Sequence, residues 1–173
     1  IAVVGFASGK NWNGQSYNYG NTEVFIGANG NKYGTDAKGV YKEAFMDMDV
    51  AADVAQVEAS IGALDANGGT LVNLGVEMAN GIFAANPIPF GEKRNRVVIV
   101  FTDGQPGWSG YDSTIANSAI TQTTTSKNTY GATVYTVGIF EGANVNGTDN
   151  TNTFMRKLSS GTGYYLTASN STV

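Results

Sequence analysis

The 173-residue chain contains neither cysteine nor histidine. Their absence excludes disulfide bonds, thiolate zinc sites, cysteine nucleophiles and every catalytic triad that depends on histidine. Any metal ion in this protein must therefore be held by oxygen atoms, which favours Mg²⁺, Ca²⁺ or Mn²⁺. The lack of cysteine in a chain rich in glycine, asparagine and threonine also suits a cell-surface protein whose compartment offers no dependable disulfide chemistry.

Charged residues are scarce as well, at 14% of the chain, and the net charge is −4. The densest basic group is Lys93-Arg94 with Arg96, which is too small to bind a phosphate backbone, so nucleic acid is not an expected partner. The apolar runs are far shorter than the ~20 residues that a membrane-spanning helix needs, and no signal-peptide pattern is present. The length and the 42% hydrophobic content predict one domain with a substantial core.

The most informative stretch is an apolar run that leads into a carboxylate. Val97 to Phe101 are five consecutive apolar residues, and Thr102, Asp103 and Gly104 follow them directly. Such a run predicts a parallel strand that is buried on both faces, and the functional crevice of a parallel sheet lies at the carboxyl ends of its strands. Asp103 is therefore a candidate metal ligand or general base, although a carboxylate here can also close a turn or cap a helix.

Patterns typical of strands and helices alternate along the chain. Besides Val97–Phe101, apolar and β-branched runs predict strands over Ile1–Ala7, Thr22–Gly27 (at a sheet edge), Gly131–Phe140 and Gly163–Thr167. Apolar spacings of three and four residues predict helices over Asp53–Leu64, Leu71–Ile82, Tyr111–Ser126 and Thr153–Ser160. Strands separated by helices imply right-handed crossovers, so the expected fold is an α/β domain with a doubly wound, mainly parallel sheet.

Thr70 is the second candidate ligand. It follows two glycines at the start of a predicted helix, where its hydroxyl can cap the helix or face a bound ion, whereas Asp53 is the expected N-cap of the preceding helix. Thr70 and Asp103 together offer a hydroxyl and a carboxylate at the same rim of a parallel sheet. Because Mg²⁺ prefers about six oxygen ligands, other groups must complete its coordination shell.

Two other kinds of site fit the sequence less well. Gly27–Gly30 and Gly68–Gly75 are rich in glycine, but neither matches a dinucleotide-binding or P-loop motif. Acid–base catalysis by carboxylates, as in glycoside hydrolysis, needs two convergent acids, and nothing pairs Asp47, Asp49 or Asp53 with Asp103.

Several segments together resemble the von Willebrand factor type A (vWA) domain. Val-Val-Ile-Val-Phe-Thr-Asp-Gly-Gln-Pro (97–106) is similar to that family's third metal motif, and Gly-Gly-Thr-Leu-Val-Asn-Leu-Gly (68–75) resembles its second. Residues 131–138 are similar to the strand that follows, and residues 158–165 contain matches to the closing helix and strand. The resemblance implies a three-layer, Rossmann-like, doubly wound sheet with one antiparallel edge strand. The insertions rich in Tyr, Asn and Gly look most like those of bacterial adhesins and pilus-tip proteins.

The family's first motif, Asp-x-Ser-x-Ser after the first strand, is not found in this sequence. Ile1–Ala7 resembles the family's second strand instead. We therefore expect residues 1–173 to be a single vWA-like domain whose first strand and helix lie upstream, lost by cleavage or carried on another chain. Because the first strand is central in this fold, its loss would leave buried backbone groups unpaired, so the missing segment is itself an expected partner.

The function that the resemblance implies is a non-enzymatic adhesion module at the cell surface. A divalent cation, Mg²⁺ by preference with Mn²⁺ or Ca²⁺ as alternatives, is held by Thr70, Asp103 and the absent Asp and Ser residues. An acidic side chain of a protein ligand, from host extracellular matrix or another surface protein, then fills the open coordination position.

The loops around the predicted cation set the specificity in this hypothesis. They are expected at Ser8–Gly20, Gly104–Tyr111 and Glu141–Thr151, with aromatic residues as candidate anchors: Trp12, Trp108 and Tyr111. These aromatics fit simple packing of the loops equally well.

Two other functions stay open. One is a structural pilus or surface-protein domain that binds no metal. The other is a Mg²⁺-dependent hydrolase, which would require a base or nucleophile near Asp103 that the sequence does not offer.

Overall fold

Helices and strands alternate along the part of the chain that the computed structural model describes. It comprises residues 1–6, 51–62 and 69–168, together with the backbone of residues 11–12, 15–16, 24–26 and 32–33. The predicted α/β class is confirmed, and the chain divides into two compact units, Ile1–Pro87 and Ile88–Val173. None of the helices in the described ranges combines the length and the apolar character of a membrane span.

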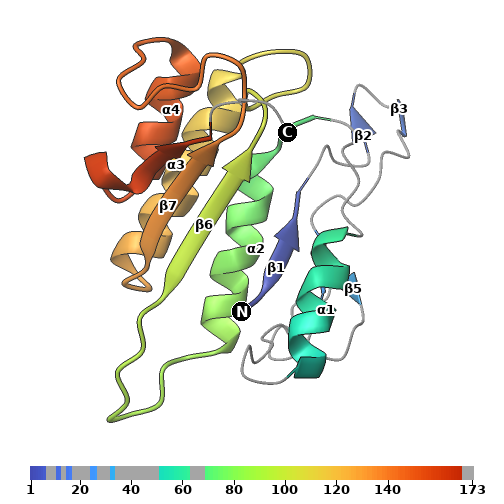
Figure 1. Ribbon diagram of the computed structural model, residues 1–173, viewed down its shortest axis with the longest axis vertical. Coiled ribbons are helices and arrows are strands. Elements are labelled where there is room, and N and C mark those ends of the chain that lie inside the picture. The colour runs from blue at the N-terminus through green and yellow to red at the C-terminus, as the bar shows by residue number, and fades with distance from the viewer. Residues whose placement is uncertain are drawn as a thin grey trace. The chain divides into compact units, whose positions relative to one another are not determined.

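The first unit holds two small antiparallel arrangements of strands (Figure 1). β1 (Val3–Gly5) pairs with β4 (Val24–Ile26), and β4 pairs in turn with β5 (Lys32–Tyr33). A separate two-stranded ribbon joins β2 (Asn11–Trp12) to β3 (Gln15–Ser16). Because β4 has a neighbour on each side, the prediction that this strand lies at a sheet edge is wrong.

Two helices complete the first unit, α1 (Ala51–Gly62) and α2 (Val72–Ala85). α1 begins before Asp53, so the predicted N-cap is wrong, and Asp53 instead places its charge in the first turn, near the positive end of the helix dipole. In α2, Met78 and Ile82 form a buried pair on which Ala2 and Val4 pack. The apolar stripe predicted for this helix is therefore its buried face.

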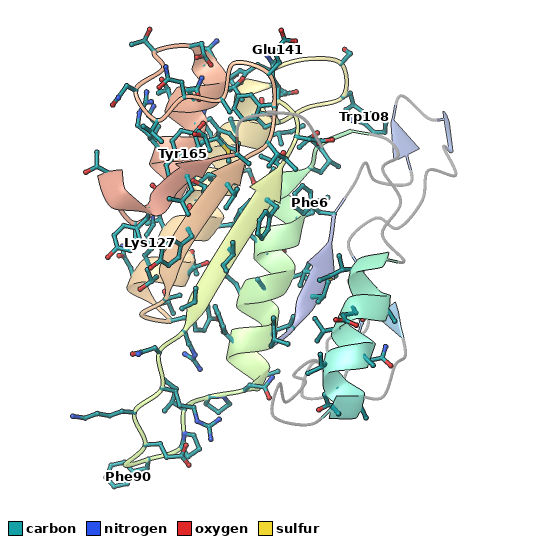
Figure 2. All side chains as sticks on the ribbon, viewed as in Figure 1. Phe6, Phe90, Trp108, Lys127, Glu141 and Tyr165 are labelled. Carbon is teal, nitrogen blue, oxygen red and sulfur yellow. The ribbon has the colours of Figure 1, made fainter. Side chains whose placement is uncertain are left out.

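Glycine is required at one point of α2. A Cβ atom at Gly75 would lie 2.8 Å from Cδ1 of the Phe6 ring, which is closer than carbon atoms approach in folded proteins (Figure 2). The missing side chain at Gly75 thus lets the aromatic ring after β1 lie directly against the helix.

The second unit is built on a parallel sheet with the order β6 (Val97–Thr102), β7 (Thr133–Gly138) and β8 (Tyr165–Thr167). The connecting helices α3 (Ser113–Asn128) and α4 (Asn150–Leu158) both pack on β7 and on each other (Figure 1). The core between helices and sheet consists of apolar side chains from all these elements: Val98, Val100, Ala116, Ala119, Val134, Phe154, Met155, Leu158 and Tyr165. A 3₁₀ turn at Thr162–Tyr164 leads into β8.

Lys127 ties the last turn of α3 to the end of α4. Its Nζ atom donates to the carbonyl oxygens of Leu158 and Ser159, both at 3.1 Å, and to that of Lys157 at 3.4 Å (Figure 2). The carbonyls in the last turn of a helix have no partner within the helix, and a cation there also faces the negative end of the helix dipole. Partial burial lowers the pKa of the Lys127 ammonium group.

The β6 strand is confirmed at the predicted position, but the prediction that both of its faces are buried is wrong. Val98, Val100 and Thr102 are buried, whereas Val97, Ile99 and Phe101 are 48%, 55% and 58% exposed. A continuous apolar run does not show which of its side chains are covered, because that depends on the elements that pack on each face.

The backbone N–H and C=O groups of β6 also differ between alternate residues, in the edge of the strand to which they point. The amides of Thr133 and Ile139 donate to the carbonyls of Arg96 and Thr102, so the even-numbered residues of β6 bond to β7. In a parallel ladder the odd-numbered residues then direct their N–H and C=O groups to the opposite side. Within the described residues, β6 pairs with β7 alone. Among the described residues, the outer edge of β6 therefore has no partner strand, and we call it the open edge; it lies at the same residues whose side chains are exposed.

Candidate functional site

The turn after β6 exposes the side chain of Asp103 to solvent. The hydroxyl of Thr102, itself buried, donates to the carbonyl of Gly104 at 3.2 Å and accepts from the Gly104 amide at 3.3 Å. These two bonds close a tight turn around Asp103, whose side chain is exposed. The turn thus presents a carboxylate at the carboxyl end of a parallel strand, which is where the sequence places the functional rim.

The loop between β6 and α3 is fixed at its base. The Asp112 amide donates to the carbonyl of Pro106 at 2.7 Å, and the Asp112 carboxylate caps α3 by accepting from the amides of Thr114 and Ile115 at 2.7 and 3.2 Å. Gly107, inside the loop, has a φ of +146°, and a Cβ atom there would overlap the carbonyl oxygen of Gly110. The loop path therefore requires glycine at position 107.

The loop between β7 and α4 is organised by a single buried side chain. Asn152 is 2% exposed and uses both ends of its amide group. Its Oδ1 accepts from the Asn144 amide at 2.8 Å and from the Tyr165 hydroxyl at 2.5 Å, while its Nδ2 donates to the Gly142 carbonyl at 3.0 Å and to Asp149 Oδ2 at 2.6 Å. Asn152 thereby holds both ends of the 142–149 segment and joins them to β8.

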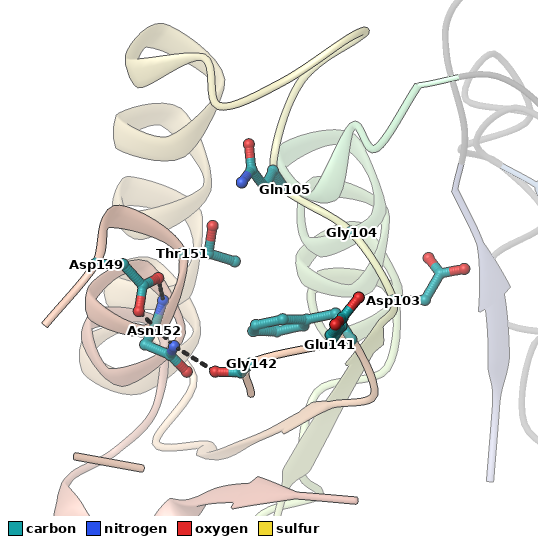
Figure 3. Close-up of a pocket in the computed structure, with 9 residues that line it drawn as sticks. Asp103, Gly104, Gln105, Glu141, Gly142, Asp149, Thr151 and Asn152 are labelled. Carbon is teal, nitrogen blue, oxygen red and sulfur yellow. Dashed lines mark hydrogen bonds between the residues drawn. The ribbon is translucent and has the colours of Figure 1, made fainter. Parts of the chain in front are cut away.

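These two loops enclose a pocket of about 420 Å³ at the carboxyl end of the parallel sheet (Figure 3). Its lining comes entirely from the second unit: Asp103, Gly104, Gln105, Phe140, Glu141, Gly142, Asp149, Thr151 and Asn152. Three of these residues are acidic and none is basic, so the pocket has a negative potential. Within the described residues, no three acidic side chains are grouped so that they could hold one metal ion.

A sequence model of the von Willebrand factor type A domain matches residues 29–173. The chain belongs to this family. No curated protein matches it. vWA domains have a Rossmann-like α/β fold, are generally non-enzymatic modules for protein interaction and adhesion, and often bind a divalent cation. The resemblance read from residues 68–75 and 97–106 is thus confirmed at the level of the family.

The two predicted ligands of the cation belong to different units of the structure. Asp103 lies at the pocket of the second unit, whereas Thr70 belongs to the first unit, directly before Leu71, the N-cap residue of α2. The N-cap position of α2 is occupied by Leu71, so Thr70 is not the N-cap residue. The cation site of Thr70 and Asp103 therefore stays a prediction.

The three aromatic residues predicted as anchors of the ligand differ in their structural surroundings. The Trp12 backbone is part of β2, but its side chain and most of Ser8–Gly20 lie outside the described residues. Trp108 and Tyr111 are half-buried, and the Tyr111 ring contacts Phe154 edge to face, with 6.4 Å between the ring centroids. Tyr111 thus packs on the core of its own unit, which favours the loop-packing interpretation for this residue.

Five polar residues of the pocket were not singled out in the sequence: Gln105, Glu141, Asp149, Thr151 and Asn152. Glu141 directly follows the predicted strand Gly131–Phe140 and lies three residues after the end of β7, so the rule that parallel strands end at one rim was enough to find it. Nothing in the sequence distinguishes Asn152 from its many neighbouring asparagines, because its role depends on the position of Tyr165 in space.

Asp149 leads to a prediction about pH. Its carboxylate accepts hydrogen bonds from the side chain and the amide of Asn152, and these bonds lower its pKa below the usual range. A lowered pKa contributes stability that is present above about pH 4 and is lost as the pH falls through the folded-state value. We expect Asp149→Ala to lower the free energy of unfolding by about 1 kcal/mol at pH 6, as for other N-caps, and by less at pH 3.

Urea unfolding of the wild type, Asp149→Ala and Asp149→Asn at both pH values tests this prediction. Asn is also a good N-cap but does not titrate, so Asp149→Asn should stay closer to the wild type at pH 6. A stability difference between wild type and Asp149→Ala that is the same at pH 6 and pH 3 would contradict the assignment.

Proposed function

We propose that this vWA domain is a cell-surface adhesion module that recognises an acidic side chain of a partner protein through a divalent cation. Thr70 and Asp103 supply two of the cation's ligands, and Mg²⁺ is the preferred ion, with Mn²⁺ or Ca²⁺ as alternatives. The observation that carries this proposal is the exposed Asp103 carboxylate, which the Thr102–Gly104 turn holds at the carboxyl end of β6. Carboxylate and hydroxyl oxygens are the ligands that such hard cations take.

Two ligands are too few for a tightly bound Mg²⁺ ion. In this proposal the Asp-x-Ser-x-Ser motif completes the shell and reaches the site on an upstream first strand with its helix. The open edge of β6 supports the proposal, since the backbone groups of Val97, Ile99 and Phe101 pair with no strand in the described part of the chain and can accept a further strand. The exposed side chains of these residues would be covered by the helix that follows that strand.

The partner is a protein, and the domain itself performs no catalysis in this proposal. Host extracellular matrix and another surface protein are the two candidate sources of the acidic ligand. The location at the cell surface and the likeness to bacterial adhesins and pilus-tip proteins are part of the proposal, and the cysteine-free composition with 23 glycines supports them.

Metal titration of a chain that includes the upstream segment tests the cation site. We expect Mg²⁺ to raise the thermal unfolding temperature relative to EDTA, because an ion at 100 times its Kd stabilises the folded state by about 2.7 kcal/mol. Asp103→Asn and Thr70→Val should remove this response, whereas Glu92→Gln, which removes a charge from an exposed ion pair, should keep it. An unfolding temperature that does not respond to Mg²⁺ or EDTA would refute the proposal and favour a structural spacer without metal.

Hydrogen exchange tests the added strand independently of metal. The amides of Ile99 and Phe101 should exchange rapidly in the 173-residue chain and slowly in the extended chain, because a new strand would bond to them. The amides of Val98 and Val100, which face β7, are the internal control and should be protected in both. Protection of Ile99 that does not change between the two chains would exclude a strand at this edge.

A further inference from the structure

The loop that leads into β6 carries a fully exposed aromatic side chain. Phe90 is 108% exposed, and Figure 2 shows its ring at the end of the loop, directed away from the sheet and the helices of the second unit. We call residues 89–96 of this loop the tip. Single apolar side chains on a protein surface are common, so the significance of Phe90 depends on what holds it and on what surrounds it.

The backbone of the tip holds Phe90 in a fixed turn. The amide of Glu92 donates to the carbonyl of Pro89 at 3.0 Å, and Gly91 has a φ of +87°. This combination is typical of a type II turn, whose third residue needs a positive φ and is usually glycine. Pro89 restricts the chain further, because its ring fixes its own φ. The aromatic ring is therefore presented to a partner in advance, at little cost in conformational entropy.

The residues after this turn give the tip a positive charge. Glu92, Lys93, Arg94 and Arg96 together carry a net charge of +2, whereas the whole chain carries −4. Arg94 forms an ion pair with Glu92 at 2.6 Å, and Arg96 is held by the carbonyl and the ring of Tyr130. Lys93 is exposed and takes part in neither contact. The tip thus favours a negatively charged partner, although the chain as a whole repels one.

An apolar ring followed by cations matches the surface of an anionic lipid bilayer. The ring can enter the boundary of the acyl chains while the long basic side chains keep their charges at the level of the headgroups. Three cations alone bind an anionic surface weakly, and so does one ring, but membrane attachment becomes effective when two such signals act together. A bilayer also accepts a narrow tip without a matching shape, whereas a specific protein interface needs roughly 800 Å² from each partner.

We propose that the tip docks on an anionic lipid bilayer, with Phe90 inserted among the lipids and Lys93 and Arg94 at their phosphates. The tip precedes β6 and Asp103 follows it, so the two lie at opposite ends of one strand. Docking through the tip would direct the Asp103 end of the sheet away from the bilayer and towards a partner protein. The inference goes beyond the proposed function and requires neither the cation nor an upstream segment.

Sedimentation of the 173-residue chain with lipid vesicles in EDTA tests the proposal. Vesicles of equal parts phosphatidylcholine and phosphatidylglycerol should bind the chain about thirtyfold more strongly than vesicles of phosphatidylcholine alone, because two net positive charges lie near the anionic surface. Sodium chloride at about 1 M, where the Debye length is about 3 Å, should remove most of this preference.

Variants of the tip separate the contribution of the ring from that of the charges. Phe90→Ala should lower the partition coefficient for anionic vesicles about tenfold, since it removes the apolar group that leaves water. Lys93→Gln should lower it about fivefold, whereas Glu92→Gln, which raises the net charge of the tip, should increase it about fivefold. Lys93→Arg keeps the charge and should bind as the wild type does.

Leu166→Ala is the matched control for the ring. Leu166 is an apolar residue of β8 that is 48% exposed and lies outside the tip, so its replacement should leave vesicle binding unchanged. Because Phe90 is fully exposed, its variants are expected to fold, which circular dichroism checks. Phe90→Trp reports insertion directly, since brominated lipids should quench its fluorescence more strongly than that of the wild type.

A wild-type chain that stays in solution with anionic vesicles would overturn the proposal and leave a pocket in a protein as the receptor of the ring. Equal binding by the wild type and Phe90→Ala, or equal binding to neutral and anionic vesicles, would overturn it as well. These measurements contain no Mg²⁺, so their outcome is independent of the cation site. Vesicle binding by a chain whose extended form does not respond to Mg²⁺ would refute only the metal-dependent function.

Discussion

Replacing Asn152 by alanine is expected to lower the free energy of unfolding by about 3 kcal/mol, although the residue lies in a polar segment. The change removes all four side-chain hydrogen bonds of Asn152 at once. The hydroxyl of Tyr165, which is 2% exposed, would then be buried without an acceptor, and such a group alone costs about 1–3 kcal/mol. The 142–149 loop would also lose the contacts that hold its two ends together.

Urea unfolding followed by circular dichroism measures this loss. Tyr165→Phe is an informative comparison, because it removes the hydroxyl itself and so leaves no buried donor without an acceptor. It should lower the free energy of unfolding by only about 1 kcal/mol. Asn146→Ala is the matched control, since Asn146 is an exposed asparagine of the same loop and should stay within about 0.5 kcal/mol of the wild type. If Asn152→Ala lowers the free energy of unfolding no more than Tyr165→Phe does, the hydrogen bonds of Asn152 do not hold the loop as described.

Gly107→Ala is expected to be destabilising by a similar amount, about 3 kcal/mol. A φ of +146° is open to glycine and strained for other residues, which contributes about 1–3 kcal/mol. The new methyl group would in addition overlap the Gly110 carbonyl oxygen, a backbone atom that cannot turn aside as a side chain can. The loop between β6 and α3 would have to move, and with it Gln105 at the wall of the pocket.

The variant Gly142→Ala separates the cost of backbone strain from the cost of steric overlap. Gly142 also has a positive φ, +81°, but no atom lies within 4 Å of the position that a Cβ would occupy. Its replacement should therefore cost only the backbone strain, about 1 kcal/mol. If urea unfolding shows that Gly107→Ala and Gly142→Ala lower the free energy of unfolding equally, the overlap at Gly107 is relieved by a small local shift.

The elements of the fold were predictable where apolar residues recur with a regular period. Met78 and Ile82 follow the helical spacing of α2, and β6 and β7 appear as β-branched runs, so these elements lie where they were predicted. The errors arose where a property depends on neighbours in space. The run Val97–Phe101 predicts a strand, but it does not show which face is covered or that β6 pairs with β7 alone within the described residues.

The residues of the candidate site that directly follow a predicted strand could be predicted from the sequence. Asp103 was found because it follows an apolar run, and the same rule applies to Glu141. Asn152 could not be found in this way, since its role depends on burial and on its hydrogen-bond partners in space. The N-cap role of Asp149 had a local signal, an aspartate before a helical segment, which lies within what was taken as a loop.

The open edge of β6 also has a consequence for the behaviour of the protein in concentrated solution. Val97–Thr102 is a six-residue segment without charge, proline or glycine, the composition typical of strands that stack between identical copies. Within the described residues, the same positions of this strand have exposed apolar side chains and backbone groups without a partner strand, so we expect that two molecules can pair along it without unfolding. Arg96, just before the strand, places a positive charge at its beginning, where repulsion between copies opposes parallel pairing at low ionic strength; the charge of Arg94 is already paired with Glu92. Added salt should therefore promote self-association of this chain.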